Sequence, residues 1–222
     1  MVKVCIFDLD GTLGDTRQSL VRSVEQTLAR MELPPITEEQ CISFVGNGAR
    51  RLMEKALTAS GPENISRIEE GMEVYGDIFD KNCTYGIRSY DGIHDVLDGM
   101  NQAGIKLAVL SNKPHRQTEK VVNAMFGADT FAYVQGQKET IPRKPDPAAF
   151  ERIMERFDVS REECLYVGDS EVDVVAGKNA GIKTISVSWG FRTKEELKAA
   201  GAEYIIDKAV ELLQYMKEGG VR

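Results

Sequence analysis

Residues 101–110 read N-Q-A-G-I-K-L-A-V-L, and the same design recurs as K-N-A-G-I-K-T-I-S-V at residues 178–187 and K-A-A-G-A-E-Y-I-I-D at residues 198–207. In each copy a helical stretch ends in Ala-Gly and an apolar, β-branched run follows at once. Gly104 and Gly181 stand where a helix ends in a left-handed residue, which glycine adopts without steric cost. Helices and strands that alternate in this way predict a parallel sheet with helices on both faces.

Short apolar runs supply the strands of this sheet. Several of them are apolar enough to be covered on both faces, as parallel strands are. Capping boxes, in which a Ser or Thr and a Glu reach each other's backbone amides, predict helix starts at Ser160 and Thr193. The expected strands are residues 2–7, 105–110, 131–135, 164–168, 183–188 and 203–206. The fold class that we expect is α/β, with a doubly wound, Rossmann-like parallel sheet.

A helical segment interrupts the pattern after the first strand. Its amphipathic periodicity shows no convincing strand. The periodicity breaks at Pro34-Pro35, Gly46-Asn47-Gly48 and Gly61-Pro62. We expect a small α-helical cap domain at residues 16–85, inserted into a core domain of residues 1–15 and 86–222, with hinges near Gly14 and Gly86. The alternative is one longer domain with extra helices.

Composition narrows the class of protein. The chain has 222 residues, of which 42% are hydrophobic and 28% charged, and this balance is ordinary for a globular protein. No apolar run approaches the ~20 residues of a membrane span, and the amino terminus lacks a secretory signal, so we expect a cytoplasmic protein without a membrane partner. The net charge of −7 argues against a nucleic-acid partner. The scattered cysteines form no metal-binding pair and are expected to be reduced thiols.

Polar side chains stand at the carboxyl ends of the expected strands. Asp8 and Asp10 end the first strand, Ser111 and Asn112 the second, and Asp169 a third. These ends meet at one edge of a parallel sheet, so the side chains should gather there. Asp8 and Asp10 are two residues apart in an extended segment and should approach each other, and a divalent cation would relieve their repulsion. An oxygen-only set of ligands is typical of Mg²⁺.

Two further charged residues fit the same site. Asp173 follows Asp169 by four residues, one helical turn away on the same face, and is expected to support the metal. Lys144 lies in the proline-stiffened turn P-R-K-P-D-P (142–147), where an ammonium would balance a phosphate beside the acids. Taken singly, each pattern is more often a solvated surface charge. The position of the Asp169–Asp173 pair directly after an apolar strand and a glycine, and the stiff loop that holds Lys144, favour the functional interpretation.

Together these groups predict phosphoryl transfer. Asp8 would attack phosphorus and form an aspartyl-phosphate, while Mg²⁺ bridges the nucleophile and the phosphate. Asp10 would protonate the leaving alkoxide and later take a proton from the attacking water. Backbone amides in the turn opened by Gly11, with the hydroxyls of Thr12 and Ser111, would cradle phosphate oxygens. Glycine is expected there because a side chain would block the approach.

Four motifs in this order resemble the haloacid dehalogenase superfamily of phosphatases. The motifs are D-L-D-G-T (8–12), S-N-K (111–113), K-P-D-P (144–147) and G-D-S-x-x-D (168–173). The resemblance implies that Asp8 is the nucleophile and Asp10 the general acid and base. It also implies that Ser111 binds phosphate and that Lys144 balances charge. The implied metal ligands are Asp8, the backbone carbonyl of Asp10, and Asp169, with Asp173 in support.

The helical segment narrows the resemblance. V-G-N-G-A-R-R-L-M-E-K-A-L (45–57), with the later segments S-N-K-P-H, W-G-F-R and G-A-E-Y-I-I-D, is similar to phosphoglycolate phosphatases. This similarity implies a small phosphorylated metabolite as substrate, with 2-phosphoglycolate the leading candidate. Arg50 and the amides of the G-N-G turn are candidates to meet its organic part. The full set of expected substrate-binding residues is Gly11, Thr12, Ser111, Asn112 and Arg50.

Other activities remain open at this point. A phosphomutase resembling β-phosphoglucomutase, a pyrophosphatase or a broad-specificity metabolite phosphatase of the same superfamily would carry the same motifs. A receiver-type signalling domain, which is not an enzyme, also places acids and a lysine at the end of a doubly wound sheet. Its chain is much shorter, however, and it carries no helical insert behind its first strand.

Overall fold

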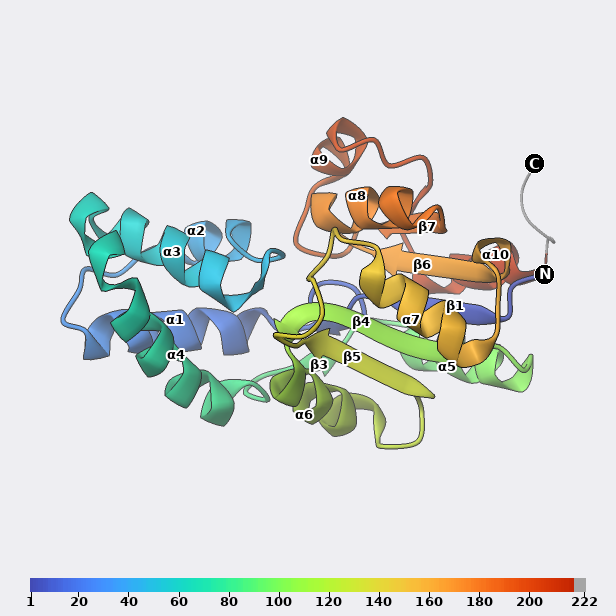
Figure 1. Ribbon diagram of the computed structural model, residues 1–222, viewed down its shortest axis with the longest axis horizontal. Helices are drawn as coiled ribbons and strands as arrows, with labels where there is room; N and C mark the ends of the chain where they lie inside the picture. The colour runs from blue at the N-terminus through green and yellow to red at the C-terminus, as the bar shows by residue number, and fades with distance from the viewer. Residues whose placement is uncertain (218–222) are drawn as a thin grey trace.

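The structure is a computed structural model that describes residues 1–217 of the chain (Figure 1). Its centre is a parallel sheet with the strand order β5-β4-β1-β6-β7-β8. The strands are β1 (Val4–Phe7), β4 (Lys106–Pro114), β5 (Tyr133–Gln137), β6 (Cys164–Gly168), β7 (Lys183–Val187) and β8 (Ile205–Ile206). The chain winds outward from β1 in one direction and then in the other, so the expected doubly wound α/β fold is confirmed.

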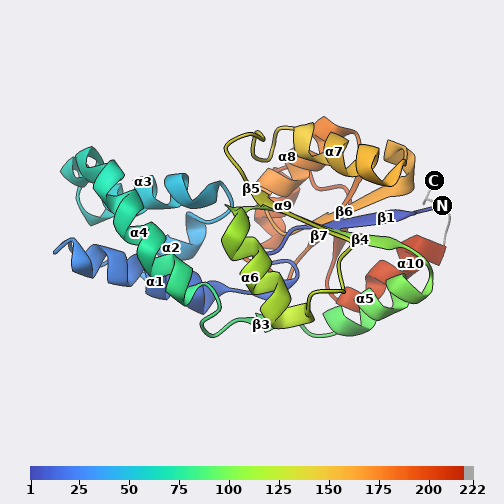
Figure 2. The ribbon, with the colours of Figure 1, turned by 60° about the horizontal axis from the view of Figure 1, so that its bottom comes forward.

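Helices cover both faces of the sheet (Figure 2). One face carries α5 (Ile93–Gln102), α6 (His115–Phe126) and α10 (Leu212–Lys217), and the other carries α7 (Ala148–Phe157) and α8 (Glu171–Ala180), against which α9 (Lys194–Ala199) packs. Side chains of β1 alternate between the two layers. Cys5 and Phe7 join the core under α5 and α6, while Val4 and Ile6 join the core under α7 and α8. Burial on both faces explains why the whole strand is apolar.

The helical segment forms a lobe beyond the carboxyl end of the sheet (Figure 1). We call residues 17–82 the helical lobe. It consists of α1 (Arg17–Arg30), α2 (Glu38–Ser43), α3 (Gly48–Ser60), a 3₁₀ helix (Pro62–Arg67) and α4 (Ile68–Asn82). The chain enters the lobe through β2 (Gly14–Asp15) and leaves it through β3 (Arg88–Ser89), and these two short strands pair antiparallel. Gly14, an expected hinge, therefore lies in a hydrogen-bonded ladder.

Most strand boundaries lie within two residues of the expected ones. The main correction concerns β4, which continues to Pro114, so Ser111 and Asn112 lie within the strand and do not follow its end. The register against β5 shifts between Leu110 and Pro114. Because β1 ends opposite Val109, Ser111 still lies beyond the carboxyl end of its neighbouring strand.

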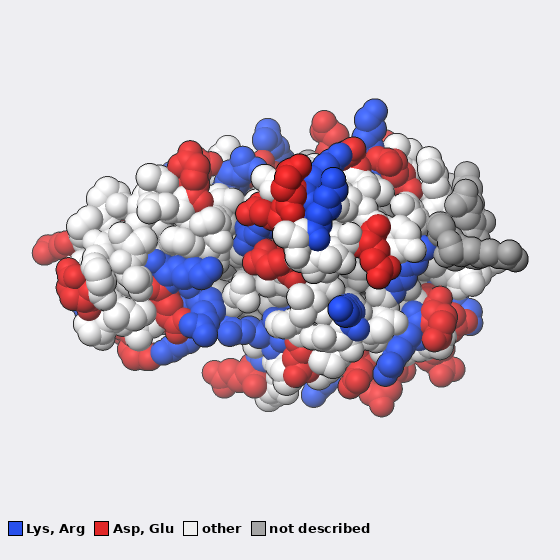
Figure 3. All heavy atoms as spheres, turned by 90° about the horizontal axis from the view of Figure 1, so that it is seen from above, with Lys and Arg blue, Asp and Glu red and all other residues white. Residues whose placement is uncertain are grey.

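Local signals in the sequence are confirmed. Gly104 and Gly181 have φ angles of 77° and 66°. Thr193 and Glu196 form the capping box at the start of α9, and Ser160 caps the 3₁₀ turn before β6. The four cysteines are buried and free. Figure 3 shows acidic and basic side chains interspersed on the face seen from above. No helix within residues 1–217 is long and apolar enough to cross a membrane.

Candidate active site

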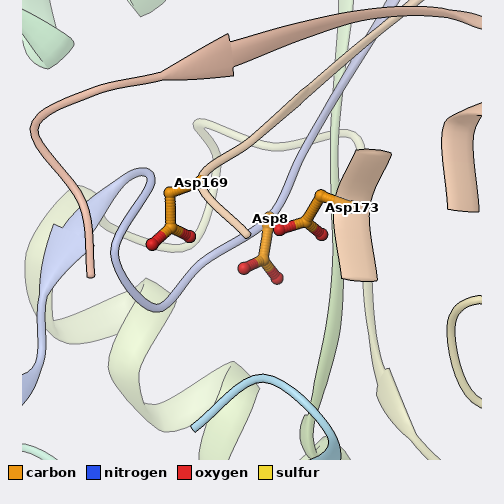
Figure 4. Close-up of side chains that lie close together, drawn as sticks. All are labelled: Asp8, Asp169 and Asp173. Carbon is orange, nitrogen blue, oxygen red and sulfur yellow. The ribbon is translucent and has the colours of Figure 1, made fainter. Parts of the chain in front are cut away.

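Three buried aspartates meet at the carboxyl edge of the sheet (Figure 4). Asp8 directly follows β1, Asp169 directly follows the neighbouring β6, and Asp173 lies in the first turn of α8. One carboxylate oxygen of each lies within 4.8 Å of the others, and we call the three residues the acid cluster. The parallel pairing of β1 with β6 brings Asp8 and Asp169 together because both strands end at the same level.

Lys144 lies buried against this cluster. Its Nζ donates hydrogen bonds of 2.8 Å to Asp8 Oδ1, Asp173 Oδ1 and the hydroxyl of Tyr166. Asn112 holds the lysine segment in place, since its side chain accepts from the Lys144 amide and donates to the Lys144 carbonyl. The Lys144 side chain is 2% exposed, so the alternative of a solvated surface charge is excluded.

Burial and neighbouring charges shift the pKa values of the three aspartates in different directions. Burial raises the pKa of Asp8 to about 7, although Lys144 pulls it down. Burial and the neighbouring charges of Asp173 and Asp8 hold the pKa of Asp169 well above its ordinary value. Burial also acts on Asp173, but the charge and hydrogen bond of Lys144 outweigh it and lower this pKa. One lysine thus compensates part of the negative charge of the cluster.

The acid cluster suits a hard divalent cation. Its donors are carboxylate oxygens, which Mg²⁺ prefers, and a divalent charge would offset the repulsion that the lysine leaves. The sequence assigned Asp173 to a supporting place, and the structure brings it into direct contact with both Lys144 and the backbone amide of Ser170. These contacts occupy both of its oxygens, and its supporting place at the metal stays a prediction.

Asp10 lies near enough to Asp8 for its charge to add to the rise in the pKa of Asp8 that burial causes. Its carboxylate accepts from Thr16 Oγ1 at 2.6 Å and from Lys113 Nζ at 2.8 Å, and it does not belong to the acid cluster. The strand β1 ends at Phe7, so residue 10 lies beyond the strand. Both hydrogen bonds end on Oδ1 of Asp10, and the residue lines the pocket described below.

The turn after β1 is packed against the acid cluster. Gly11 has φ 84°, and a Cβ there would lie 2.2 Å from Asp169 Oδ2, so glycine is needed for a close approach to an acid. The groups that were expected to donate hydrogen bonds to phosphate in this turn donate to other groups of the protein. The hydroxyl of Thr12 donates to Asp169 Oδ1, and the amides of Gly11 and Thr12 donate to carbonyls of Gly14 and Leu9. Thr12 therefore supports Asp169 in this structure.

A small pocket of about 40 Å³ opens on Asp8 between the sheet and the helical lobe. The sheet side contributes Ser111 and Lys113, and the lobe contributes apolar side chains such as Leu52, Tyr75 and Phe79. The G-N-G turn lines it as well, through glycines whose φ angles are 121° and 82°. The pocket therefore places an apolar wall opposite the charged edge.

The structure does not bring Arg50 to this pocket. Its guanidinium pairs with Glu69 and Glu54 on the exposed surface of the lobe. Asn112 lines the pocket, but its side chain bonds the carbonyls of Gly46 and Lys144. No contact in the structure therefore supports the expected role of Arg50 in binding substrate. The side chain of Asn112 links β4 to the backbone at Gly46 and at Lys144.

Sequence reasoning missed several residues of the site. Lys113 is 2% exposed, pairs with Asp10 and lies 4.8 Å from the ring centroid of Phe79. Its only signal was its place in S-N-K. Arg192 lines the pocket, and its signal was its place in W-G-F-R. Tyr166, in the middle of a buried strand, carried no signal at all.

Groups arranged in this way serve phosphate chemistry, in which the protein mainly positions groups and balances charge. The fold and the site define an enzyme of the phosphatase class. A family model described as haloacid dehalogenase-like hydrolase matches residues 5–187, and the chain belongs to this family. The resemblance drawn from the four motifs is confirmed, and the receiver-type alternative is excluded.

Similar proteins share nearly the whole chain. The phosphoglycolate phosphatase of Vibrio parahaemolyticus is 31% identical over 217 residues, which are 96% of this chain and 95% of that protein. The phosphoglycolate phosphatase of Vibrio vulnificus strain YJ016 is 32% identical over 216 residues, with the same shares covered. A crystal structure from Lactobacillus delbrueckii subsp. bulgaricus has a TM-score of 0.90 at 29% identity and covers 96% of this chain and 98% of its own.

Proposed function

We propose that the protein hydrolyses a small phosphomonoester in a Mg²⁺-dependent reaction through an aspartyl-phosphate, and that 2-phosphoglycolate is the leading substrate. The observation that carries the reaction is the contact of Asp8 with Lys144 beside Asp169, at the floor of a pocket. The similarity to phosphoglycolate phosphatases over 96% of the chain supports the substrate.

The first half of the reaction transfers the phosphoryl group to Asp8. A carboxylate oxygen of Asp8 bonds to phosphorus, and the bond from phosphorus to the ester oxygen breaks. Asp10, which lines the same pocket, gives its proton to the leaving alkoxide. Lys144 and Ser111 stand where they can balance and bind the phosphoryl oxygens.

The second half returns the enzyme to its starting state. A water attacks phosphorus, Asp10 takes one of its protons, and the bond from Asp8 to phosphorus breaks to release inorganic phosphate. The hydrogen bonds from Thr16 and Lys113 fix the Asp10 carboxyl group for both proton transfers. The fixed position of Asp10 thus serves both halves of the reaction.

Asp8, Asp169 and the backbone carbonyl of Asp10 would hold Mg²⁺, with Asp173 in support. Burial, with the charges of neighbouring aspartates, raises the pKa values of Asp8 and Asp169, and a bound cation would favour their ionised forms. When bound, the ion supplies Lewis-acid polarisation of a phosphoryl oxygen.

We also propose that residues 16–85 form a cap domain on a core of residues 1–15 and 86–222. The pocket lies between the two parts, and Asp10 contacts Thr16 at the start of α1. Closure of the cap would exclude water and complete the site. Scattering or crystal structures with and without a phosphate mimic test this motion, and an unchanged cap angle would contradict it.

A panel of phosphate esters assayed with Mg²⁺ and with a chelator tests the substrate and the metal. We expect 2-phosphoglycolate to give the highest kcat/KM, and the chelator to abolish turnover. Sugar phosphates and pyrophosphate belong in the panel, because preference for either would support the phosphomutase or pyrophosphatase alternative. A low rank of 2-phosphoglycolate would reject the substrate while leaving the reaction class intact.

The nucleophile has its own test. Asp8→Asn should abolish turnover, because the amide fills the same space but cannot attack phosphorus. The protein should still unfold in one cooperative transition, since Asp173 and Tyr166 keep their bonds to Lys144. Asp129→Asn, the same change at an exposed turn, serves as the control. Mass spectrometry of the wild type, quenched during turnover, should show a phosphorylated peptide that contains Asp8. An active Asp8→Asn protein would falsify the assignment.

A further inference from the structure

The segment W-G-F-R at residues 189–192 lies directly against the acid cluster, and we call it the strap. The backbone amide of Phe191 donates to Asp169 Oδ2 at 2.7 Å. A Cβ on Gly190 would lie 2.3 Å from the Cβ of Asp169, so no side chain fits at that position. Two consecutive residues of the strap thus pack on one acid of the cluster.

The last residue of the strap reaches from the sheet to the helical lobe. Arg192 is 8% exposed, and its Nε donates to Glu171 Oε2 at 2.8 Å. Its Nη2 donates to the carbonyl of Val45 at 2.7 Å, and longer contacts of 3.4 Å reach the carbonyls of Ile42 and Ser43. The shortest of these bonds reaches Val45, two residues beyond the end of α2, so the guanidinium holds the backbone that follows this helix.

The backbone that Arg192 holds forms part of the pocket. Val45 and Gly46 both line it, and the carbonyl of Gly46 accepts from the side chain of Asn112. The exposed Arg143 donates to the carbonyl of Asn47 from the outer side. Residues 44–47, which we call the pocket turn, are therefore held by the buried donors of Arg192 and Asn112, whereas water can replace the exposed bond of Arg143.

We propose that Arg192 is a positioning residue that holds the pocket turn over the substrate, so that the fit of the organic part of the ester depends on it. The proposal rests on the proposed function. The strap sets the place of Asp169 through its backbone and the place of the pocket turn through Arg192. Glu171 keeps the guanidinium directed at the carbonyls, because the planar group can donate to Glu171 and to the carbonyl of Val45 at the same time.

Kinetics of two substrates separate positioning from a general structural role. For Arg192→Met we expect kcat/KM for 2-phosphoglycolate to fall by about 10- to 100-fold, mostly through KM, because charged hydrogen bonds to the pocket turn are lost. Acetyl phosphate, with its activated leaving group, should lose less than about threefold. Arg192→Lys should recover part of the loss. Arg143→Gln removes an exposed donor to the same turn and should have a small effect. An equal loss for both substrates would overturn the proposal.

A second measurement does not depend on activity. Hydrogen exchange of the metal-free protein should be about tenfold faster for amides of residues 42–48 in Arg192→Met than in the wild type or in Arg143→Gln. Trp189, the single tryptophan of the chain, donates from Nε1 to the carbonyl of Thr12 and reports on the strap itself. Its emission should stay unchanged.

The outcomes are distinct. Unchanged hydrogen exchange in residues 42–48 of Arg192→Met would overturn the proposal. A red-shifted emission of Trp189 in this variant would also overturn it, because it would show that the side chain of Arg192 serves to fold the strap. A wild-type protein without activity on 2-phosphoglycolate would reject the proposed substrate, and the exchange experiment would still decide the place of Arg192.

Discussion

Lys144 shows how a single residue can serve both folding and chemistry. Its ammonium is enclosed by Asp8, Asp173 and Tyr166, and these acids hold its pKa above the ordinary value in spite of burial. A buried charge is tolerated only when it is paired, so the lysine and the two acids depend on one another. The same charge stands beside the carboxylate that is proposed to meet phosphate.

Lys144→Met should destabilise the protein by about 3–5 kcal/mol near neutral pH, since it leaves buried carboxylates without a partner. The pKa of Asp173 lies below its ordinary 3.8, so its ionised form contributes stability above that pH, and the contribution is lost as the pH falls. The deficit of the variant should therefore shrink toward acid pH. Urea unfolding as a function of pH measures it, with the exposed Lys178→Met as the control. A deficit independent of pH would contradict this account.

Gly11→Ala should cost both stability and activity. An alanine Cβ would meet the carboxylate of Asp169, whereas Gly104 has a similar φ of 77° with nothing within 4 Å of its Cβ. Gly104→Ala should lose only the ~1–2 kcal/mol of a left-handed alanine and keep its activity. Urea unfolding and kcat compare the two variants. Equal effects would show that backbone conformation alone requires glycine at position 11.

At the scale of residues, motifs predicted which side chains meet but not all of their contacts. Asp8, Lys144 and Asp169 converge as the strand ends require. The carboxylate of Asp10 accepts from Lys113, and the hydroxyl of Thr12 donates to Asp169. Such contacts depend on the path of a turn, which residue types alone do not fix.

Charged side chains of α4 in the helical lobe and of α6 on the sheet form a contact between the two parts, in addition to the pocket that both parts line. Asp80, near the end of α4, accepts from Lys120 Nζ at 2.7 Å and from Gln117 Nε2 at 3.0 Å, both on α6. Arg116 lies 3.3 Å from the same carboxylate. The hydrogen bond from Lys120, with the charges of Arg116 and Lys120, lowers the pKa of Asp80.

Asp80→Asn should raise KM by about two- to fivefold, in keeping with the small free energy of a partly exposed ion pair. In the wild type, KM should rise with added salt, because salt screens the contact between α4 and α6. In the variant this dependence should weaken. Asp77→Asn makes the same charge change at an exposed position of α4 and is the control. The same salt dependence in the wild type and Asp80→Asn would refute the role of this contact.

The six strands of the parallel sheet and the helical nature of the inserted segment followed from the sequence, because glycine stops, capping boxes and apolar runs are local signals. The short antiparallel pair of β2 and β3 carried no such signal. The extension of β4 to Pro114 did not, since it arises from a register shift against β5 that only the assembled sheet shows. The place of Arg50 on the outer surface also depends on how α3 turns relative to the pocket. Local periodicity predicts which face of a helix is buried, but not which element packs against that face.

For the whole molecule, metal and proton should compete. Burial raises the pKa of Asp8 from its ordinary 3.8 to about 7, so in the metal-free protein it contributes stability at low pH that is lost as the pH rises through 7. Mg²⁺ would bind the ionised form and release protons. We expect Mg²⁺ to raise Tm more at about pH 8 than at about pH 6. Calorimetry of the wild type and of Asp169→Asn checks this, and an equal rise in the two proteins would place the ion elsewhere.

The pairing of β2 with β3 has a consequence for how such a chain can change. Asp15 and Arg88 are register partners, so the path out to the helices and the path back lie side by side. A segment whose two ends are neighbours can be shortened, lengthened or exchanged without stretching the rest of the chain, because the closure of its loop costs little more as its length changes. Transplanting residues 16–87 between relatives should therefore alter the choice of ester and leave the bond-breaking apparatus unaltered.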